Sequence, residues 1–162
     1  MSASPRLRPI HDDDVPTVLA LNERDVELLA PLDETRLTQL RRWADRADVI
    51  DVGGAVAGFV LTFGAGTDYD SENYLWFTRR FGDGFAYLDR IVIAEQFRRR
   101  GLGRLVYDEL EALALPFGRM TLEVNVEPPN EGSLAFHGGR GYTELGRRGD
   151  TGHVVALMVK EL

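Results

Sequence analysis

Short apolar or alternating runs along the chain predict strands. The run "RLRPI" alternates between polar and apolar positions, and "DVIDV" and "AVAGFVLTF" flank a Gly53-Gly54 pair that is typical of a tight hairpin turn. "FAYLDRIVI" has the nearly continuous apolar character of a buried strand. The predicted strands cover residues 6–10, 48–52, 55–63, 85–93, 119–126, 142–148 and 152–162.

Helical spacing of apolar residues separates these strands. An acidic start at residues 11–14, with Pro16 in the first turn, predicts a helix that continues to about Ala30. A second helix is predicted within residues 31–44, capped by Asp33, and a short one within residues 130–140, begun by Asn130.

A further helix is predicted from Gly101 to about Leu115. Its expected apolar stripe is Leu102, Leu105, Val106, Leu110 and Leu113, and its expected outer face is Asp108, Glu109 and Glu111. Residues 64–84 fit neither period and predict a long loop, a feature that is often functional. Long strands with intervening helices predict one α/β or α+β domain over residues 1–162, built around a central sheet.

Composition narrows the function classes. The formal net charge of -7 argues against nucleic acid as a partner. The absence of cysteine excludes disulfides, thiolate metal sites and a cysteine nucleophile, and the three histidines lack metal-ligand spacing. The N-terminus has no apolar signal region and no run reaches transmembrane length, so we expect a cytoplasmic protein with no metal and no membrane partner.

The stretch "FRRRGLGRLV" (97–106) places three arginines and two glycines before a helix. Free N–H groups in the first turn of a helix and the helix dipole can bind an anion, and arginines add charged donors. The stretch therefore has the character of a diphosphate-binding loop. Val106 stands where a dinucleotide-binding fingerprint needs its third glycine, and the lysine of a Walker A loop is missing. A solvated arginine turn is the alternative.

The surrounding sequence resembles the GNAT acetyltransferases. "FAYLDRIVIAEQFRRRGLGRLVYDELEALA" is similar to their central motif, in which Arg98, Gly101 and Gly103 match the Arg/Gln-x-x-Gly-x-Gly/Ala loop. "NEGSLAFHGGRGYTELG" is similar to their C-terminal motif, and its matching residues are Asn130, Ser133, Phe136, His137, Gly141 and Tyr142. The two motifs cover about half the chain and stand in the family's order.

The resemblance implies a mixed, mostly antiparallel sheet with helices on both faces, splayed between the strands at 86–93 and 119–126. It also implies direct transfer of an acetyl group from acetyl-CoA to an amine of a small molecule or peptide, without a metal. Dimers are common in the family, so a homodimer is compatible with it. A non-catalytic acyl-CoA-binding or sensing domain is the alternative.

Roles in coenzyme A binding follow from the same resemblance. The backbone of Ile91, Val92 and Ile93 is expected to contact the pantetheine arm and the acetyl carbonyl. The backbone N–H groups of Arg99, Arg100, Gly101, Leu102, Gly103 and Arg104 are expected to bind the pyrophosphate, with Arg98 adding charge. Asn130, Ser133 and Phe136 are expected beside the pantetheine arm.

The catalytic groups have alternatives in the sequence. His137 stands where many relatives place the tyrosine that protonates the leaving thiolate, and packing is the alternative. Asp89 and Glu123 are rival general bases, and water is a third choice. Strand alternation places Glu123 and Asn125 on one face.

Residues for the acceptor are expected mainly in the loop at 64–84. Aromatic and short polar side chains there suit a small polar acceptor, and acidic residues favour a cationic amine. The acceptor candidates are Asn22, Tyr69, Asp70, Ser71, Asn73 and Asn125.

Overall fold

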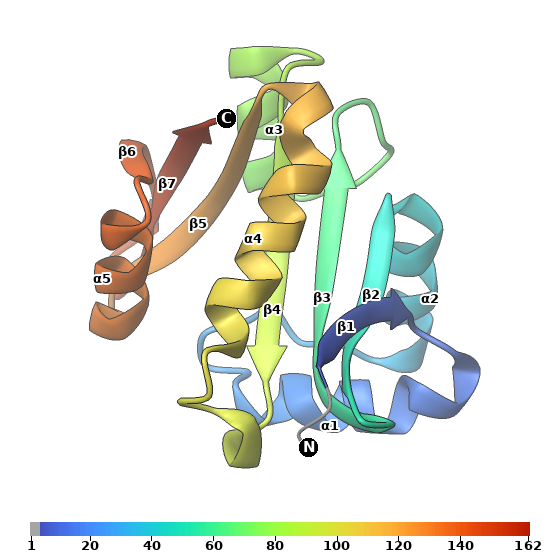
Figure 1. The fold of residues 1–162 in the computed structure, drawn as a ribbon. Helices are drawn as coiled ribbons and strands as arrows, with labels where there is room; N and C mark the ends of the chain where they lie inside the picture. The colour runs from blue at the N-terminus through green and yellow to red at the C-terminus, as the bar shows by residue number, and fades with distance from the viewer. Residues whose placement is uncertain (1–3) are drawn as a thin grey trace. The chain divides into compact units, whose positions relative to one another are not determined.

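The computed structural model describes residues 4–162, whose strands form one seven-stranded sheet (Figure 1). The strands are β1 (Pro5–Pro9), β2 (Arg46–Val52), β3 (Ala55–Gly64), β4 (Ala86–Ile93), β5 (Arg119–Glu127), β6 (Thr143–Asp150) and β7 (His153–Glu161). Their order is β1-β2-β3-β4-β5-β7-β6. The pairs β1–β2, β2–β3, β5–β7 and β6–β7 are antiparallel, and β4–β5 is parallel. The predicted α/β class with a mostly antiparallel sheet is confirmed.

Helices connect most of these strands. The α-helices are α1 (Val15–Arg24), α2 (Glu34–Trp43), α3 (Glu72–Phe81), α4 (Leu102–Ala114) and α5 (Glu131–Gly139), and the short 3-10 helices are η1 (Asp12–Asp14), η2 (Glu95–Phe97) and η3 (Leu115–Phe117). Within residues 4–162, no helix is long and apolar enough to cross a bilayer. The described residues form two compact units. The first comprises residues 4–63 and 88–113, and the second comprises residues 64–87 and 114–162.

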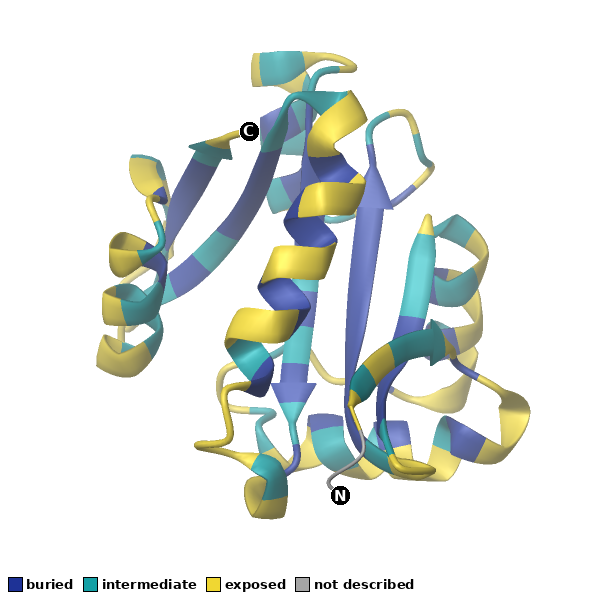
Figure 2. Ribbon diagram, in the orientation of Figure 1, coloured by how far each residue is buried: buried dark blue, intermediate teal, exposed yellow. Residues whose placement is uncertain are grey.

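The first unit has its core on β2 and β3, where Val49, Ile50 and Phe59 are fully buried (Figure 2). Gly58 lies so close to the end of β4 that a Cβ atom built on it would approach the Val92 carbonyl oxygen at a clashing distance. A glycine is needed at this position because any side chain would push the two backbones apart.

Helix α1 ends at Arg24, so the prediction of a helix reaching Ala30 is wrong. The Leu28 and Leu29 amides donate to the Asp25 carbonyl at 2.9 and 3.1 Å, which forms a turn in place of a continuous helix. The buried side-chain amide of Asn22 donates to the Ala30 carbonyl at 3.0 Å and holds the chain there. Helix α2 begins as predicted, with the Asp33 carboxylate accepting from the Arg36 amide at 2.7 Å.

Helix α4 occupies its predicted range but buries a different face. Leu105 and Leu113 are 50% and 43% exposed, so the predicted stripe is wrong at these two positions, and Glu111 is only 8% exposed, so the predicted outer face is wrong there. The buried row follows a spacing of four residues, which brings side chains to one side of a helix. Its members are Leu102, Val106, Leu110 and Ala114.

The second unit contains helix α3 where a long loop was predicted, so that prediction is wrong. The Ser71 hydroxyl accepts from the Tyr74 amide at 3.3 Å and caps the helix. Tyr74 and Phe77, one turn apart, are buried and pack against Tyr87 at ring-centroid distances of 5.7 and 5.9 Å. The aromatic residues therefore form the buried face of a helix.

The parallel pairing of β4 with β5 also belongs to the second unit. Among the described residues it joins Ala86 to Met120 and Tyr87 to Thr121. The Thr121 hydroxyl donates to the Ala86 carbonyl at 2.9 Å and reinforces this short ladder. The splay between these strands and the single-domain organisation remain predictions.

Candidate functional site

The loop that follows β4 exposes three consecutive arginines. Arg98 forms ion pairs with Glu95 at 3.2 Å and Asp25 at 3.6 Å, and the Arg100 guanidinium lies 5.2 Å from the centre of the Phe97 ring. These contacts are on the surface, where ion pairs contribute little to stability. The guanidinium groups are therefore held near the loop at small energetic cost and can exchange partners for an anion.

The backbone of this loop turns sharply into helix α4. Arg99 and Gly101 both have positive φ, 63° and 75°, and the Leu105 amide donates to the Gly101 carbonyl at 3.2 Å as the first helical bond. The N–H groups of the first helical turn have no acceptor within the helix. N–H donors at a helix N-terminus beside guanidinium groups form a donor set suited to a phosphate anion.

The end of β4 is tied to α1 by a contact that the sequence did not predict. The Arg24 guanidinium donates to the Ile93 carbonyl at 2.9 Å and forms a two-point pair with Asp25 at 2.8 and 3.1 Å. The hydrogen bonds that Arg24 donates to the Asp25 carboxylate hold the pKa of Arg24 above its ordinary value. Ile91 and Ile93 are half-buried and Val92 is buried, as strand alternation requires. No local motif could indicate Arg24, because it lies 69 residues before Ile93.

Asp89, one predicted base, belongs to a buried polar cluster. Its carboxylate accepts from Arg90 Nε at 2.6 Å, and each of these side chains is 6% exposed. Arg90 also donates to the Asn22 side-chain oxygen at 3.0 Å and to the Ala30 carbonyl at 3.2 Å. Asn22, a predicted acceptor residue, is thus fully buried in this cluster. The structure brings Asn22 and Asp89 together through Arg90, which the sequence did not single out.

Glu123, the rival base, has a neutral partner. The Tyr87 hydroxyl donates to Glu123 Oε2 at 2.5 Å. Glu123 and Asn125 are half-buried, whereas Leu122 and Val124 are buried, in agreement with the predicted alternation. The sequence indicated Glu123 but not Tyr87, since the two are 36 residues apart.

Most of the acceptor candidates before β4 make contacts that stabilise the local structure. Ser71 caps α3, and the Asn73 side chain accepts from Arg148 on β6 at 3.1 Å. Tyr69 is buried, with its ring 5.6 Å from Tyr74. Asp70 is exposed. The structure therefore keeps these residues in one region of the second unit, with structural contacts at three of them.

Helix α5 gathers the residues of the C-terminal motif. Asn130 caps it, as predicted, by accepting from the Ser133 amide at 3.2 Å. His137 Nδ1 lies 2.7 Å from the Ser133 carbonyl oxygen and 3.2 Å from its hydroxyl. Because a carbonyl only accepts, Nδ1 carries a hydrogen here. The buried His137 ring meets Phe136 and Tyr142 edge-on, at 5.2 and 5.4 Å.

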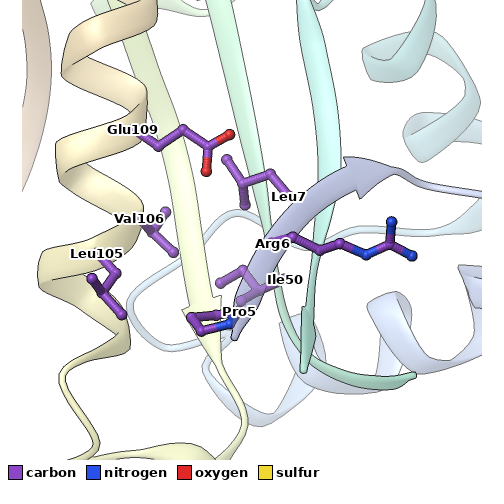
Figure 3. Close-up of a pocket in the computed structure, with 7 residues that line it drawn as sticks. All are labelled: Pro5, Arg6, Leu7, Ile50, Leu105, Val106 and Glu109. Carbon is purple, nitrogen blue, oxygen red and sulfur yellow. The ribbon is translucent and has the colours of Figure 1, made fainter. Parts of the chain in front are cut away.

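A shallow surface pocket lies elsewhere in the first unit, between α4 and β1 (Figure 3). Its lining residues are Pro5, Arg6, Leu7, Ile50, Leu105, Val106 and Glu109. None of these seven was predicted as a site residue. Among residues 4–162, no group of three His, Asp or Glu side chains is placed to hold a metal ion.

The sequence profile of the acetyltransferase (GNAT) family matches residues 10–142. The chain belongs to this family. The match spans both motifs, the loop before α4 and helix α5, so the suggested resemblance is confirmed. Membership makes the chain an acyltransferase-family protein, and acetyl-CoA is the acetyl donor that this family generally uses.

Solved structures agree on the fold. Ard1 from Thermoplasma volcanium has a TM-score of 0.75 and 17% identity, covering 98% of this chain and 97% of that one. Ribosomal-protein-alanine N-acetyltransferase from Brucella melitensis has a TM-score of 0.71 and 22% identity, covering 97% and 99%. The ribosomal-protein-S18-alanine N-acetyltransferase from Escherichia coli has a TM-score of 0.68 and 18% identity, covering 98% and 94%. No curated protein matches in sequence. At these identities the likeness shows the GNAT fold alone.

Proposed function

We propose that this GNAT protein transfers the acetyl group of acetyl-CoA directly to an amine. The observation that carries the proposal is the loop at 98–104, where exposed guanidinium groups and the first N–H groups of α4 form an anion-binding donor set directly after β4. The match of the GNAT profile to residues 10–142 supports coenzyme A as the source of that anion.

Each part of the motif has a task in this proposal. When bound, acetyl-CoA supplies an acetyl group activated as a thioester. The N–H groups from Arg99 to Arg104 hold its pyrophosphate, and Arg98 exchanges its surface ion pairs for the phosphate charge. In the first unit, the backbone of residues 91–93 contacts the pantetheine arm.

For the proton acceptor, the contacts favour Glu123 over Asp89. Protonating Asp89 would leave the buried guanidinium of Arg90 without its counterion, which is strongly unfavourable. Glu123 accepts a hydrogen bond from the neutral phenol of Tyr87, so protonation of Glu123 does not strip this partner of a counterion. We therefore propose that Glu123 takes the proton from the acceptor ammonium, directly or through water.

For the proton donor we propose His137. Its Nδ1 hydrogen is engaged by the Ser133 carbonyl, so a proton for the leaving thiolate must come from Nε2. The imidazolium form carries hydrogens on both ring nitrogens and can serve this role. The Ser133 carbonyl orients the ring by accepting from Nδ1.

The acceptor that we propose is a cationic amine of a small molecule or a peptide. Exposed Asp70 and Glu72 in the second unit supply negative charge that attracts an ammonium. Alanine peptides of ribosomal proteins belong in the test panel, because two structural neighbours are named as ribosomal-protein-alanine and ribosomal-protein-S18-alanine N-acetyltransferases.

Release of coenzyme A in the presence of varied amines tests the proposal. The chain has no cysteine, so a thiol reagent detects only released coenzyme A. The panel comprises polyamines, amino acids, aminoglycosides and peptides, with a reaction lacking acceptor as the control. Acetylated product found by mass spectrometry is expected for at least one class. Binding of acetyl-CoA without turnover on any class would favour a non-catalytic acyl-CoA-binding protein.

A further inference from the structure

The side chain of Tyr87 is a buried polar group of the second unit that the mechanism above leaves unused. The residue is fully buried at the start of β4. Its ring contacts those of Tyr69, Tyr74 and Phe77 at centroid distances of 6.3, 5.7 and 5.9 Å. Packing on three rings leaves the phenol little rotational freedom, so its hydroxyl points in a fixed direction.

The direction of this hydroxyl is toward Glu123. Tyr87 is paired in the β4–β5 ladder with Thr121, and Glu123 is the next residue on the same face of β5. The single hydroxyl hydrogen of Tyr87 is donated to Glu123 Oε2. Across the sheet, Glu123 is paired with the apolar Leu157 of β7. Its same-face neighbours on β5, Thr121 and Asn125, are uncharged.

We propose that Tyr87 is a positioning residue for Glu123. Its phenol stabilises the charged form of the carboxylate and holds it in one orientation, ready to accept a proton from the acceptor amine. A donor that packing has already fixed needs no reorganisation when the proton moves. This inference rests on the proposed role of Glu123 as proton acceptor. It adds a residue that is not among the matched positions of the loop, Arg98, Gly101 and Gly103, nor among those of the C-terminal motif.

The aromatic cluster offers a matched control. Tyr74 is also buried, and its ring belongs to the same cluster. Its hydroxyl hydrogen, however, is donated to the Gly64 carbonyl at 2.7 Å, so it is not available to Glu123. The variants Tyr87→Phe and Tyr74→Phe therefore remove the same atom from the same cluster, and only Tyr87→Phe removes the donor to the carboxylate.

Titration of the Glu123 side chain tests the contact without any substrate. Carbon-13 NMR of glutamate carboxyl groups, assigned with Glu123→Gln, would follow its protonation in the full chain. In Tyr87→Phe the midpoint is expected to rise by roughly one pH unit, because the charged form loses its donor. In Tyr74→Phe it is expected to stay at the parent value. Equal midpoints in Tyr87→Phe and the parent would overturn the proposal.

Kinetics test the functional part. With an acceptor from the amine panel, Tyr87→Phe is expected to lower kcat/KM for the amine about tenfold and to move the acid limb of its pH profile upward. The KM for acetyl-CoA should not change, and Tyr74→Phe should keep the parent profile. A shifted titration with unchanged turnover would refute the positioning role, as would an equal loss in Tyr74→Phe. An inactive parent would instead refute the proposed function, while the titration still decides whether Tyr87 controls Glu123.

Discussion

Substitution of Gly101 tests whether the loop binds coenzyme A, because its effect on affinity can be compared with its effect on stability. Gly101 has φ of 75°, and a Cβ atom built on it would meet nothing within 4 Å. A side chain at this position therefore causes backbone strain but no clash within the protein. Strain of this kind costs about 1–2 kcal/mol for an L residue, and a β-branched residue tolerates such φ values least.

The loop can relieve this strain only by changing φ, which would turn the N–H groups of the following turn away from the pyrophosphate. A loss of about 1.4–2.8 kcal/mol in binding would weaken affinity roughly ten- to a hundredfold. Gly101→Val is therefore expected to weaken binding of coenzyme A by that factor and to remain folded. Gly103→Val, one position into α4, is expected to act in the same direction by obstructing the diphosphate.

Gly66→Val is the matched control, because Gly66 has φ of 85° and equally open surroundings but lies in the second unit, before α3. Isothermal titration with coenzyme A measures affinity, and urea unfolding measures stability in the same samples. Gly66→Val should lose a similar amount of stability and keep full affinity. Unchanged affinity in both Gly101→Val and Gly103→Val would remove the loop from the binding site, and an equal loss in Gly66→Val would show a global effect.

Three further predictions follow from other contacts. His137→Phe is expected to retain affinity for acetyl-CoA and to lose a factor of about 10²–10⁴ in turnover, and His137→Tyr is expected to recover part of this loss. Equal turnover of the parent and both variants, measured with chemistry rate-limiting, would show that His137 only packs. Gly58→Ala is expected to destabilise the protein in urea unfolding, because its Cβ would collide with the Val92 carbonyl, and unaltered stability would contradict that close approach. Arg8 donates hydrogen bonds to Asp14 at 2.8 and 3.1 Å that hold the pKa of this carboxyl below its usual 3.8. The pair should therefore stabilise the fold above about pH 4. This contribution should disappear as the pH falls through the lowered pKa of Asp14. Urea unfolding of Arg8→Gln between pH 6 and 3 should therefore show a smaller change in the free energy of unfolding with pH than the parent shows. An identical change in both proteins would refute the role of the Arg8–Asp14 pair.

The sequence alone determined the features that depend on residues close together in the chain. Most strands were predictable from apolar or alternating runs, and the caps at Asp33 and Asn130 from the preference of short polar side chains for helix starts. The two GNAT motifs were recognisable for the same reason, because a loop before a helix and a capped helix are local structures. Ser71 was an equally local signal for α3, but the dense aromatic residues after it were interpreted as a loop.

Only the tertiary structure decided which faces are buried and which polar groups meet. The helical spacing of α4 allowed more than one buried face, and the folded chain buries the one that contains Glu111 and exposes Leu105. Asp89 and Glu123 looked equivalent as isolated carboxylates in strands. Their partners, a buried guanidinium for Asp89 and a neutral phenol for Glu123, come from contacts in the folded chain. Since the energy of protonating a carboxylate depends on its neighbours, the choice between the two bases could not be made from the sequence.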